Sequence, residues 1–90
     1  MSDITKRAVA GTLESSDVFV EIEPNAAGVR IEIESVVEKQ FGESILNSAR
    51  EVLAEQGVEN ALLKITDRGA LDCVIRARVE TAIVRAKEGN

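Results

Sequence analysis

Alternation of apolar and polar residues dominates the first third of the chain and constrains its fold more than any other feature. It runs through three segments, Val9–Leu13, Val18–Ile22 and Val29–Ile33. Successive side chains of a strand point to opposite faces, so each segment presents one apolar and one polar face. Three such segments in sequence predict an antiparallel sheet with one face buried and the other open to water.

The turns between these segments predict how they pair. Antiparallel pairing of the first two segments about Ser15–Ser16 sets Leu13 opposite Val18 and places Val9 and Leu13 on the apolar face. The third segment then pairs antiparallel with the second through residues 24–28, a turn that contains Pro, Asn and Gly. The sequence does not fix the order of the strands in the sheet.

A period of three to four residues replaces the alternation in the second half of the chain. It predicts an amphipathic helix that ends before Gly57 and a second helix near the C-terminus, with an alternating segment between them. Phe41 lies on the apolar stripe of the first helix, so we predict that it belongs to the core.

The predicted fold is therefore α+β, a mainly antiparallel four-stranded sheet with two helices on one face. The order is strand, strand, strand, helix, strand, helix, within one domain over residues 1–90. The predicted strands cover about 8–14, 18–23, 29–35 and 61–66, and the predicted helices about 37–56 and 70–86.

The composition argues against several functions. The net charge of −5 and the absence of Trp and Tyr disfavour a nucleic-acid partner. With no His and one Cys, the chain lacks the commonest metal ligand and general base, so we expect neither a metal site nor a catalytic residue. No run approaches the roughly 20 apolar residues of a membrane span, and the N-terminal residues lack the apolar stretch of a secretory signal. We expect no membrane partner and a cytoplasmic location.

Two adjacent hydroxyls, Ser15 and Ser16, lie between the first two strands and are flanked by Glu14 and Asp17. A wider loop over Glu14–Asp17 fits as well as a tight turn, because Ser-Ser suits the positive φ angles of a two-residue hairpin loop poorly. Turn chemistry alone predicts ordinary polar turn residues.

Three blocks of the sequence resemble the acyl carrier (gamma) subunit of citrate lyase. They read Ala-Val-Ala-Gly-Thr-Leu-Glu-Ser-Ser-Asp-Val at 8–18, Val-Glu-Lys-Gln-Phe-Gly at 37–42, and Asp-Arg-Gly-Ala-Leu-Asp-Cys-Val-Ile-Arg-Ala-Arg-Val-Glu at 67–80. The blocks follow the family's order and span nearly the whole chain. The resemblance implies that Ser15 carries phosphoribosyl-dephospho-CoA through a phosphodiester. The next position is often glycine in the family but is Ser16 here, so a second hydroxyl lies beside the first.

The resemblance further implies a non-catalytic carrier subunit. Its arm would hold acetyl and citryl thioesters and move them between the alpha (transferase) and beta (lyase) subunits, and the whole complex would cleave citrate to oxaloacetate and acetate. A separate transferase would attach the prosthetic group. The alternatives are the carrier of citramalate lyase or malonate decarboxylase, or a non-carrier α+β protein-interaction domain in which Ser15 is an ordinary turn residue.

Other polar residues have weaker claims to a role. The acidic flanks Glu14 and Asp17 suit a basic partner. Cys73 lies beside Val74, so we expect a partly buried small residue and not a nucleophile. The spacing of Asp72, Arg76 and Glu80 predicts a charge ladder along the second helix. Because this segment is one of the blocks that resemble the family, we favour the alternative that these residues form a docking face for a larger subunit. Four arginines are candidates for contacts with the phosphates of an arm: Arg68, Arg76, Arg78 and Arg85.

Overall fold

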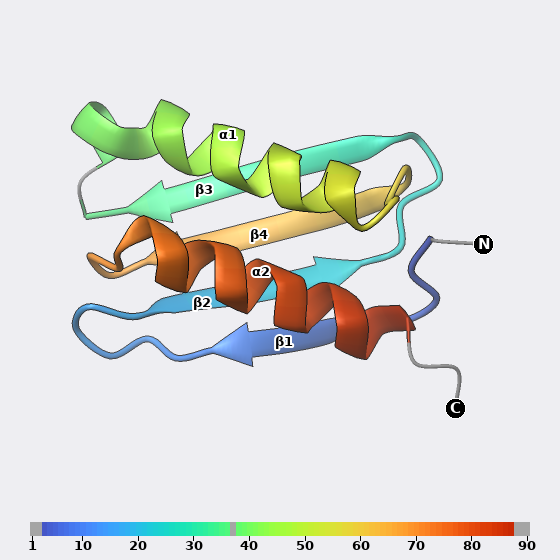
Figure 1. The fold of residues 1–90 in the computed structure, drawn as a ribbon, viewed down its shortest axis with the longest axis horizontal. Coiled ribbons are helices and arrows are strands. Elements are labelled where there is room, and N and C mark those ends of the chain that lie inside the picture. The colour runs from blue at the N-terminus through green and yellow to red at the C-terminus, as the bar shows by residue number, and fades with distance from the viewer. Residues whose placement is uncertain (1–2, 37, 88–90) are drawn as a thin grey trace.

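The computed structural model describes residues 3–36 and 38–87; for residues 38–41 it describes the backbone alone. It contains one four-stranded sheet and two helices in the predicted order (Figure 1). The predicted core position of Phe41 falls on a side chain outside the described residues. The elements are β1 (Ala8–Gly11), β2 (Val18–Glu23), β3 (Val29–Ser35), α1 (Glu38–Glu55), β4 (Ala61–Asp67) and α2 (Asp72–Lys87).

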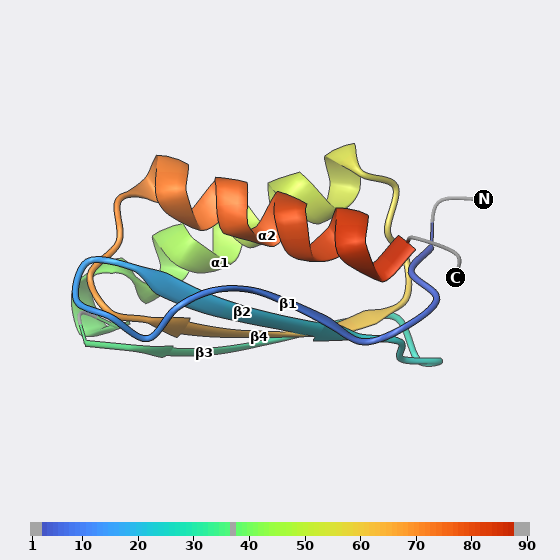
Figure 2. The ribbon, with the colours of Figure 1, turned by 90° about the horizontal axis from the view of Figure 1, so that it is seen from below.

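Both helices cover the same face of the sheet, as predicted, and leave the other face bare (Figure 2). The core lies between the two layers. Apolar residues at alternate positions of β2 and β4 meet residues spaced three or four apart on the helices, because these are the two spacings that put side chains on one face. The most deeply buried large side chains of this core are Ile22, Leu63, Ile65, Ile83, Val18, Val20 and Val79.

The sheet is mixed, which corrects the prediction of a mainly antiparallel sheet. The strand order is β1-β2-β4-β3, so β4 lies between β2 and β3, which were expected to pair with each other. β4 runs antiparallel to β2 and parallel to β3. The parallel pair follows from α1, which connects β3 to β4 as a crossover. β4 buries four of its seven residues, whereas none of β3 is fully buried, so the more apolar strand takes the central place.

The register between β1 and β2 also differs from the prediction by one residue. Ala10 lies opposite Val20, so the alanines of β1 face the core. Leu13, predicted on the apolar face, lies beyond the strand with 54% of its surface exposed. Because a slip of one residue reverses the faces of a strand, Val9 faces the bare side of the sheet. The small side chains of Ala8 and Ala10 leave room for α2, which packs directly on β1 and β2.

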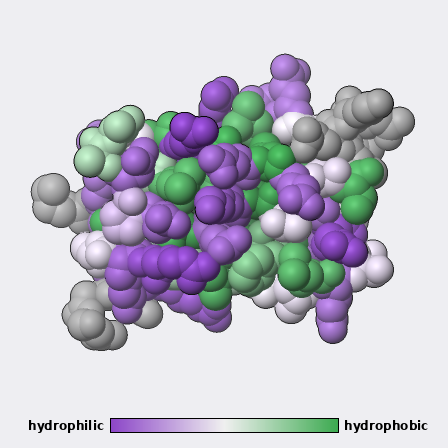
Figure 3. All heavy atoms as spheres, turned by 180° about the vertical axis from the view of Figure 1, so that it is seen from behind, coloured by the Kyte–Doolittle hydropathy of each residue, from purple (hydrophilic) through white to green (hydrophobic). Residues whose placement is uncertain are grey.

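The bare face of the sheet is largely polar, as predicted, with apolar groups between the charged ones (Figure 3). In the part of the chain that the structure describes, neither helix has the length and apolar composition that a membrane crossing requires. The charged residues whose register places them on this face are Glu21, Glu23, Arg30, Glu32, Glu34 and Lys64.

Candidate functional site

Ser15 lies in the loop of residues 12–17 that connects β1 to β2, at the end of the sheet where β4 leads into α2 (Figure 1). Two backbone hydrogen bonds close this loop. The Thr12 N–H donates to the Val18 carbonyl at 3.2 Å, and the Asp17 N–H donates to the Glu14 carbonyl at 3.1 Å. The loop is therefore wider than a two-residue hairpin turn, which agrees with the poor match of Ser-Ser to such a turn.

The far side of the loop is attached to the exit of β4. The Ser16 N–H donates to the Arg68 carbonyl at 2.8 Å, and the Arg68 N–H donates to the Asp17 carbonyl at 2.9 Å. These bonds continue the pairing of β2 with β4 beyond Val18 and Asp67, the last paired residues of the two strands. Ser15 is thus next to Ser16, whose backbone N–H is bonded to Arg68, the residue that follows central strand β4.

Asp17 connects the loop to helix α2. Its carboxylate accepts a hydrogen bond from the Thr12 hydroxyl at 2.7 Å, from the Val18 N–H at 2.8 Å, and from Arg78 Nε and Nη2 at 3.2 and 3.1 Å. The Thr12 hydroxyl, then the Val18 amide and the Arg78 guanidinium, lower the pKa of Asp17 from 3.8 to about 2. The carboxylate of Asp17 is therefore occupied by contacts within the loop and with α2. Of the two acidic residues that flank the serines, Glu14 is exposed and can contact a partner.

The two serines differ in backbone conformation. Both are exposed, and neither hydroxyl bonds to any residue the structure describes. Ser16 has a φ of 68°, in the left-handed region where glycine is strain-free. This conformation gives a physical reason for the glycine often found at the matching position of the family that the sequence resembles. Ser15 has the free hydroxyl without the unusual φ.

Gly11 allows the close approach that forms the loop. Its φ is +87°, and a Cβ at this position would lie 1.9 Å from the Val18 carbonyl oxygen. That oxygen is the acceptor for the Thr12 N–H that closes the loop. A side chain at position 11 would therefore collide with the bond that sets the loop's first residue.

The structure separates the four candidate arginines. Arg76 pairs with Glu51 at 2.8 Å, Arg78 pairs with Asp17, and Arg85 Nη1 donates to the Val9 carbonyl at 2.8 Å. The exposed Arg68 makes no ion pair or side-chain hydrogen bond with any described residue, although its backbone is bonded to the serine loop. Arg68 is accordingly the candidate that combines a free cation with a place beside Ser15.

Two predictions for helix α2 are wrong. Cys73 is exposed and not partly buried. The charge ladder does not form along α2, because Arg76 reaches across to Glu51 and to Glu55, at 3.6 Å, on α1. Glu80 likewise accepts a hydrogen bond from Gln56 at 3.2 Å. These charges join the two helices to each other.

Several known proteins resemble this chain over most of its length. The acyl carrier protein (ACP) family described as Malonate decarboxylase delta subunit (MdcD) matches residues 5–86. The citrate lyase acyl carrier protein 2 of Salmonella typhimurium is 54% identical over 86 residues, which cover 94% of this chain and 89% of that protein. The chain belongs to the citrate lyase acyl carrier protein family. The relative from Haemophilus ducreyi is 58% identical over 85 residues, covering 94% of this chain and 88% of the relative.

The fold has a counterpart among solved structures. A chain in the crystal structure of a Pseudomonas malonate decarboxylase hetero-tetramer in complex with malonate superposes with a TM-score of 0.79. It is 26% identical, and the match covers 90% of this chain and 84% of that one. The family resemblance inferred from the three sequence blocks is confirmed by the relatives.

Proposed function

We propose that this chain is the acyl carrier subunit of citrate lyase and that Ser15 is the attachment site of phosphoribosyl-dephospho-CoA. The observation that carries the proposal is the state of the Ser15 side chain. It is exposed, it bonds to no described residue, and it lies in a loop that backbone bonds fix at both ends. Membership of the citrate lyase acyl carrier protein family supports the same role.

The residues around Ser15 fit a bulky, charged group. Formation of a phosphodiester requires a hydroxyl that a transferase can reach, and the flanking residues Leu13, Glu14 and Ser16 are exposed as well. The guanidinium of Arg68 forms no ion pair with a described residue, and guanidinium groups bind phosphate oxygens well. When bound, the group supplies a terminal thiol on a long flexible arm, which holds an acyl group as a thioester.

The chain's own residues then have three tasks. Ser15 Oγ forms the covalent bond, and Asp17 and Arg78 hold the loop on helix α2. Arg68, whose backbone is bonded to Ser16, supplies a positive charge near the phosphodiester at Ser15. Tethering raises the effective concentration of the carried acyl group at the active sites of partner subunits. Cleavage of citrate to oxaloacetate and acetate belongs to the alpha and beta subunits, and attachment of the arm to a separate transferase. We place this assembly in the cytoplasm.

The carrier of malonate decarboxylase is the second candidate. The family description and the 26% identical fold neighbour favour it, whereas the relatives at 54 to 58% identity are citrate lyase carriers. The identities of the large subunits that co-purify with the chain from its native host decide between the two.

Intact mass of the chain from cells that produce the lyase subunits and the transferase tests the proposal, with fragmentation across Ala8–Val18. We expect the added mass of the arm on Ser15. The Ser15→Ala variant should remain folded and unmodified, and the matched Ser16→Ala variant should be modified normally. An unmodified wild-type chain contradicts the carrier function. Modification that survives Ser15→Ala and is lost in Ser16→Ala contradicts the site.

A further inference from the structure

Strand β3 is an edge strand whose outer side, over residues 29–33, forms no backbone hydrogen bond with any residue the structure describes. The Ala61 N–H donates to the Gly28 carbonyl, and the Val36 N–H donates to the Asp67 carbonyl. Because successive residues of a strand direct their backbone groups to opposite sides, the even-numbered residues of β3 face β4. The residues whose N–H and C=O groups point to the open edge are Val29, Ile31 and Ile33.

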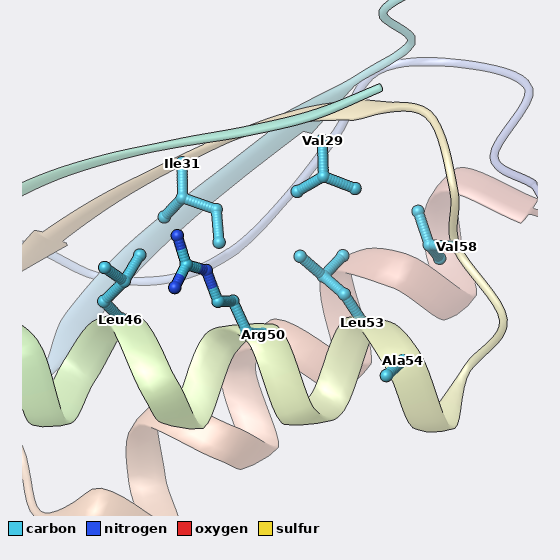
Figure 4. Close-up of a pocket in the computed structure, with 7 residues that line it drawn as sticks. All are labelled: Val29, Ile31, Leu46, Arg50, Leu53, Ala54 and Val58. Atoms are coloured by element: carbon cyan, nitrogen blue, oxygen red, sulfur yellow. The ribbon is translucent and has the colours of Figure 1, made fainter.

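Val29 and Ile31 line a groove between β3 and helix α1 (Figure 4), and Ile33 lines its continuation. One hollow of about 430 Å³ lies against Val29 and Leu53, and a second of about 370 Å³ lies against Ile33 and Gly42. Both hollows include Ile31 and Leu46, so they follow one another along the strand. An open strand edge beside an apolar groove is the arrangement that accepts an added strand, with alternate side chains entering the groove.

The opposite edge of the sheet is closed in comparison. Strand β1 has four residues where β3 has seven. The guanidinium of Arg85 donates to the Val9 carbonyl at 2.8 Å, and the chain before β1 bonds to α2 through the Ala86 carbonyl. Such coverage is a common protection of edge strands, and β3 lacks it.

The charges around the groove indicate the chemistry of its occupant. The Arg50 side chain projects from α1 toward Ile31, between Leu46 and Leu53 (Figure 4), and forms no ion pair with a described residue. A strand that covered this guanidinium would have to supply a carboxylate, because a buried unpaired charge is costly. On the other face of β3, Glu32 pairs with Arg30 at 3.2 Å. Glu34 is exposed and forms no ion pair with a described residue, so a basic side chain on an added strand would complement it.

We propose that the open edge of β3 binds an extended segment of a partner polypeptide as a fifth strand of the sheet. The segment directs apolar residues and one carboxylate into the groove, with the carboxylate at Arg50, and directs a basic residue toward Glu34. The inference rests on the proposed function in one respect, since the partner is taken to be a large subunit of the complex that the carrier serves.

Hydrogen exchange tests the backbone part of this proposal, on the chain alone and on the complex purified from the native host. We expect the amides of Ile31 and Ile33 to exchange at least tenfold more slowly in the complex. Unchanged exchange at both amides overturns the proposal. Protection that develops in the isolated chain as its concentration rises also overturns it, because the occupant would then be a second copy.

Charge reversal tests the side-chain part, by titration of the chain with the large subunits that co-purify with it. We expect Arg50→Glu to weaken this association at least tenfold, and Arg50→Lys to weaken it less. Arg7→Glu, before the opposite edge strand, is the control for charge reversal away from the groove. It breaks the surface pair of Arg7 with Glu21 but should bind as the wild type does. Equal binding by Arg50→Glu and wild type overturns the proposal.

The mass of the chain in the same samples separates the two failures. A modified Ser15 with an unprotected β3 edge contradicts only the inference about the edge. An unmodified Ser15 in an assembled complex whose β3 edge is protected contradicts only the carrier function. A chain that is unmodified and co-purifies with no other polypeptide contradicts both.

Discussion

The carboxylate of Asp17 receives two hydrogen bonds from the guanidinium of Arg78, although 61 residues separate them in the sequence. The Thr12 hydroxyl and the Val18 amide bind the same two oxygens. One carboxylate thereby joins the start of the loop, the start of β2 and helix α2. The rigidity of the loop that presents Ser15 depends on this group remaining ionised.

Acid should remove this connection in a defined pH range. The pKa of Asp17 is about 2 in the folded chain against an ordinary value of 3.8, mainly because of the Thr12 hydroxyl. A lowered folded pKa gives stability that is fully present above the unfolded value and is lost as the pH falls through the folded one. We expect Asp17→Asn to lower the unfolding free energy most above about pH 4, and the difference from wild type to shrink between about pH 4 and pH 2.

A carbon-detected NMR titration of the Asp17 carboxyl measures the same effect directly, with an expected midpoint near 2. Asp3, whose pKa is also lowered, by the Asn60 side chain first, is present in both proteins and cancels in their comparison. A midpoint at 3.8 for Asp17 would show that its hydrogen bonds do not favour the ionised form.

Ser16 should tolerate glycine better than any branched residue. Its φ of 68° costs an L-residue about 1 to 2 kcal/mol, part of which glycine returns through its larger unfolded-state entropy. We expect Ser16→Gly to change the unfolding free energy by between zero and about +1 kcal/mol and Ser16→Val to lower it by about 1 to 2 kcal/mol. Chemical denaturation measures both, and the mass of the modified chain should be the same for wild type and Ser16→Gly. A more stable Ser16→Val would contradict the left-handed conformation.

Local patterns were sufficient to predict the order and type of the six elements, because periods of two and of three to four residues report which side chains share a face. Their limits were mostly close, as for β2 and β3. The strand order was beyond such reasoning. Whether β2 pairs with β3 or with β4 depends on which strand lies between two others in the finished sheet. The turn that contains Pro, Asn and Gly after Glu23 suggests the nearer partner, β3.

The loop of residues 12–17 shows the same division. The prediction for Ser15 came from the family resemblance, which is local in the sequence. The contact of Asp17 with Arg78 was not predictable, since it requires α2 to cross β1 and β2. The register of β1 against β2 was not predictable for the same reason. It depends on the alanines of β1 fitting the space under α2, and it leaves Leu13 exposed.

Gly11 should be the position in the loop most sensitive to a methyl group. A Cβ there would lie 1.9 Å from the Val18 carbonyl oxygen, and the φ of +87° is unfavourable for alanine. We expect Gly11→Ala to lower the unfolding free energy by about 2 to 4 kcal/mol. Gly28→Ala is the matched control, since its φ is +92° and its Cβ would meet nothing within 4 Å. It should cost only about 1 kcal/mol. Equal losses for the two variants in thermal or chemical denaturation would contradict the steric argument.

Arg68 should accelerate attachment of the arm without being needed for folding. Its backbone is bonded to Ser16 and Asp17, and its cation has no partner among the described side chains, so it can bind a phosphate of the incoming group at no cost in existing ion pairs. We expect Arg68→Ala to lower the transferase's kcat/KM for this chain about three- to tenfold, equivalent to about 0.7 to 1.4 kcal/mol. The rate of mass increase measures this, and the unfolding midpoint should stay unchanged. Arg7→Ala, at the opposite end of β1, is the control for loss of an arginine far from Ser15; this arginine pairs with Glu21 at 2.6 Å. Equal rates for Arg68→Ala and Arg7→Ala would exclude a contact between Arg68 and the phosphates during transfer.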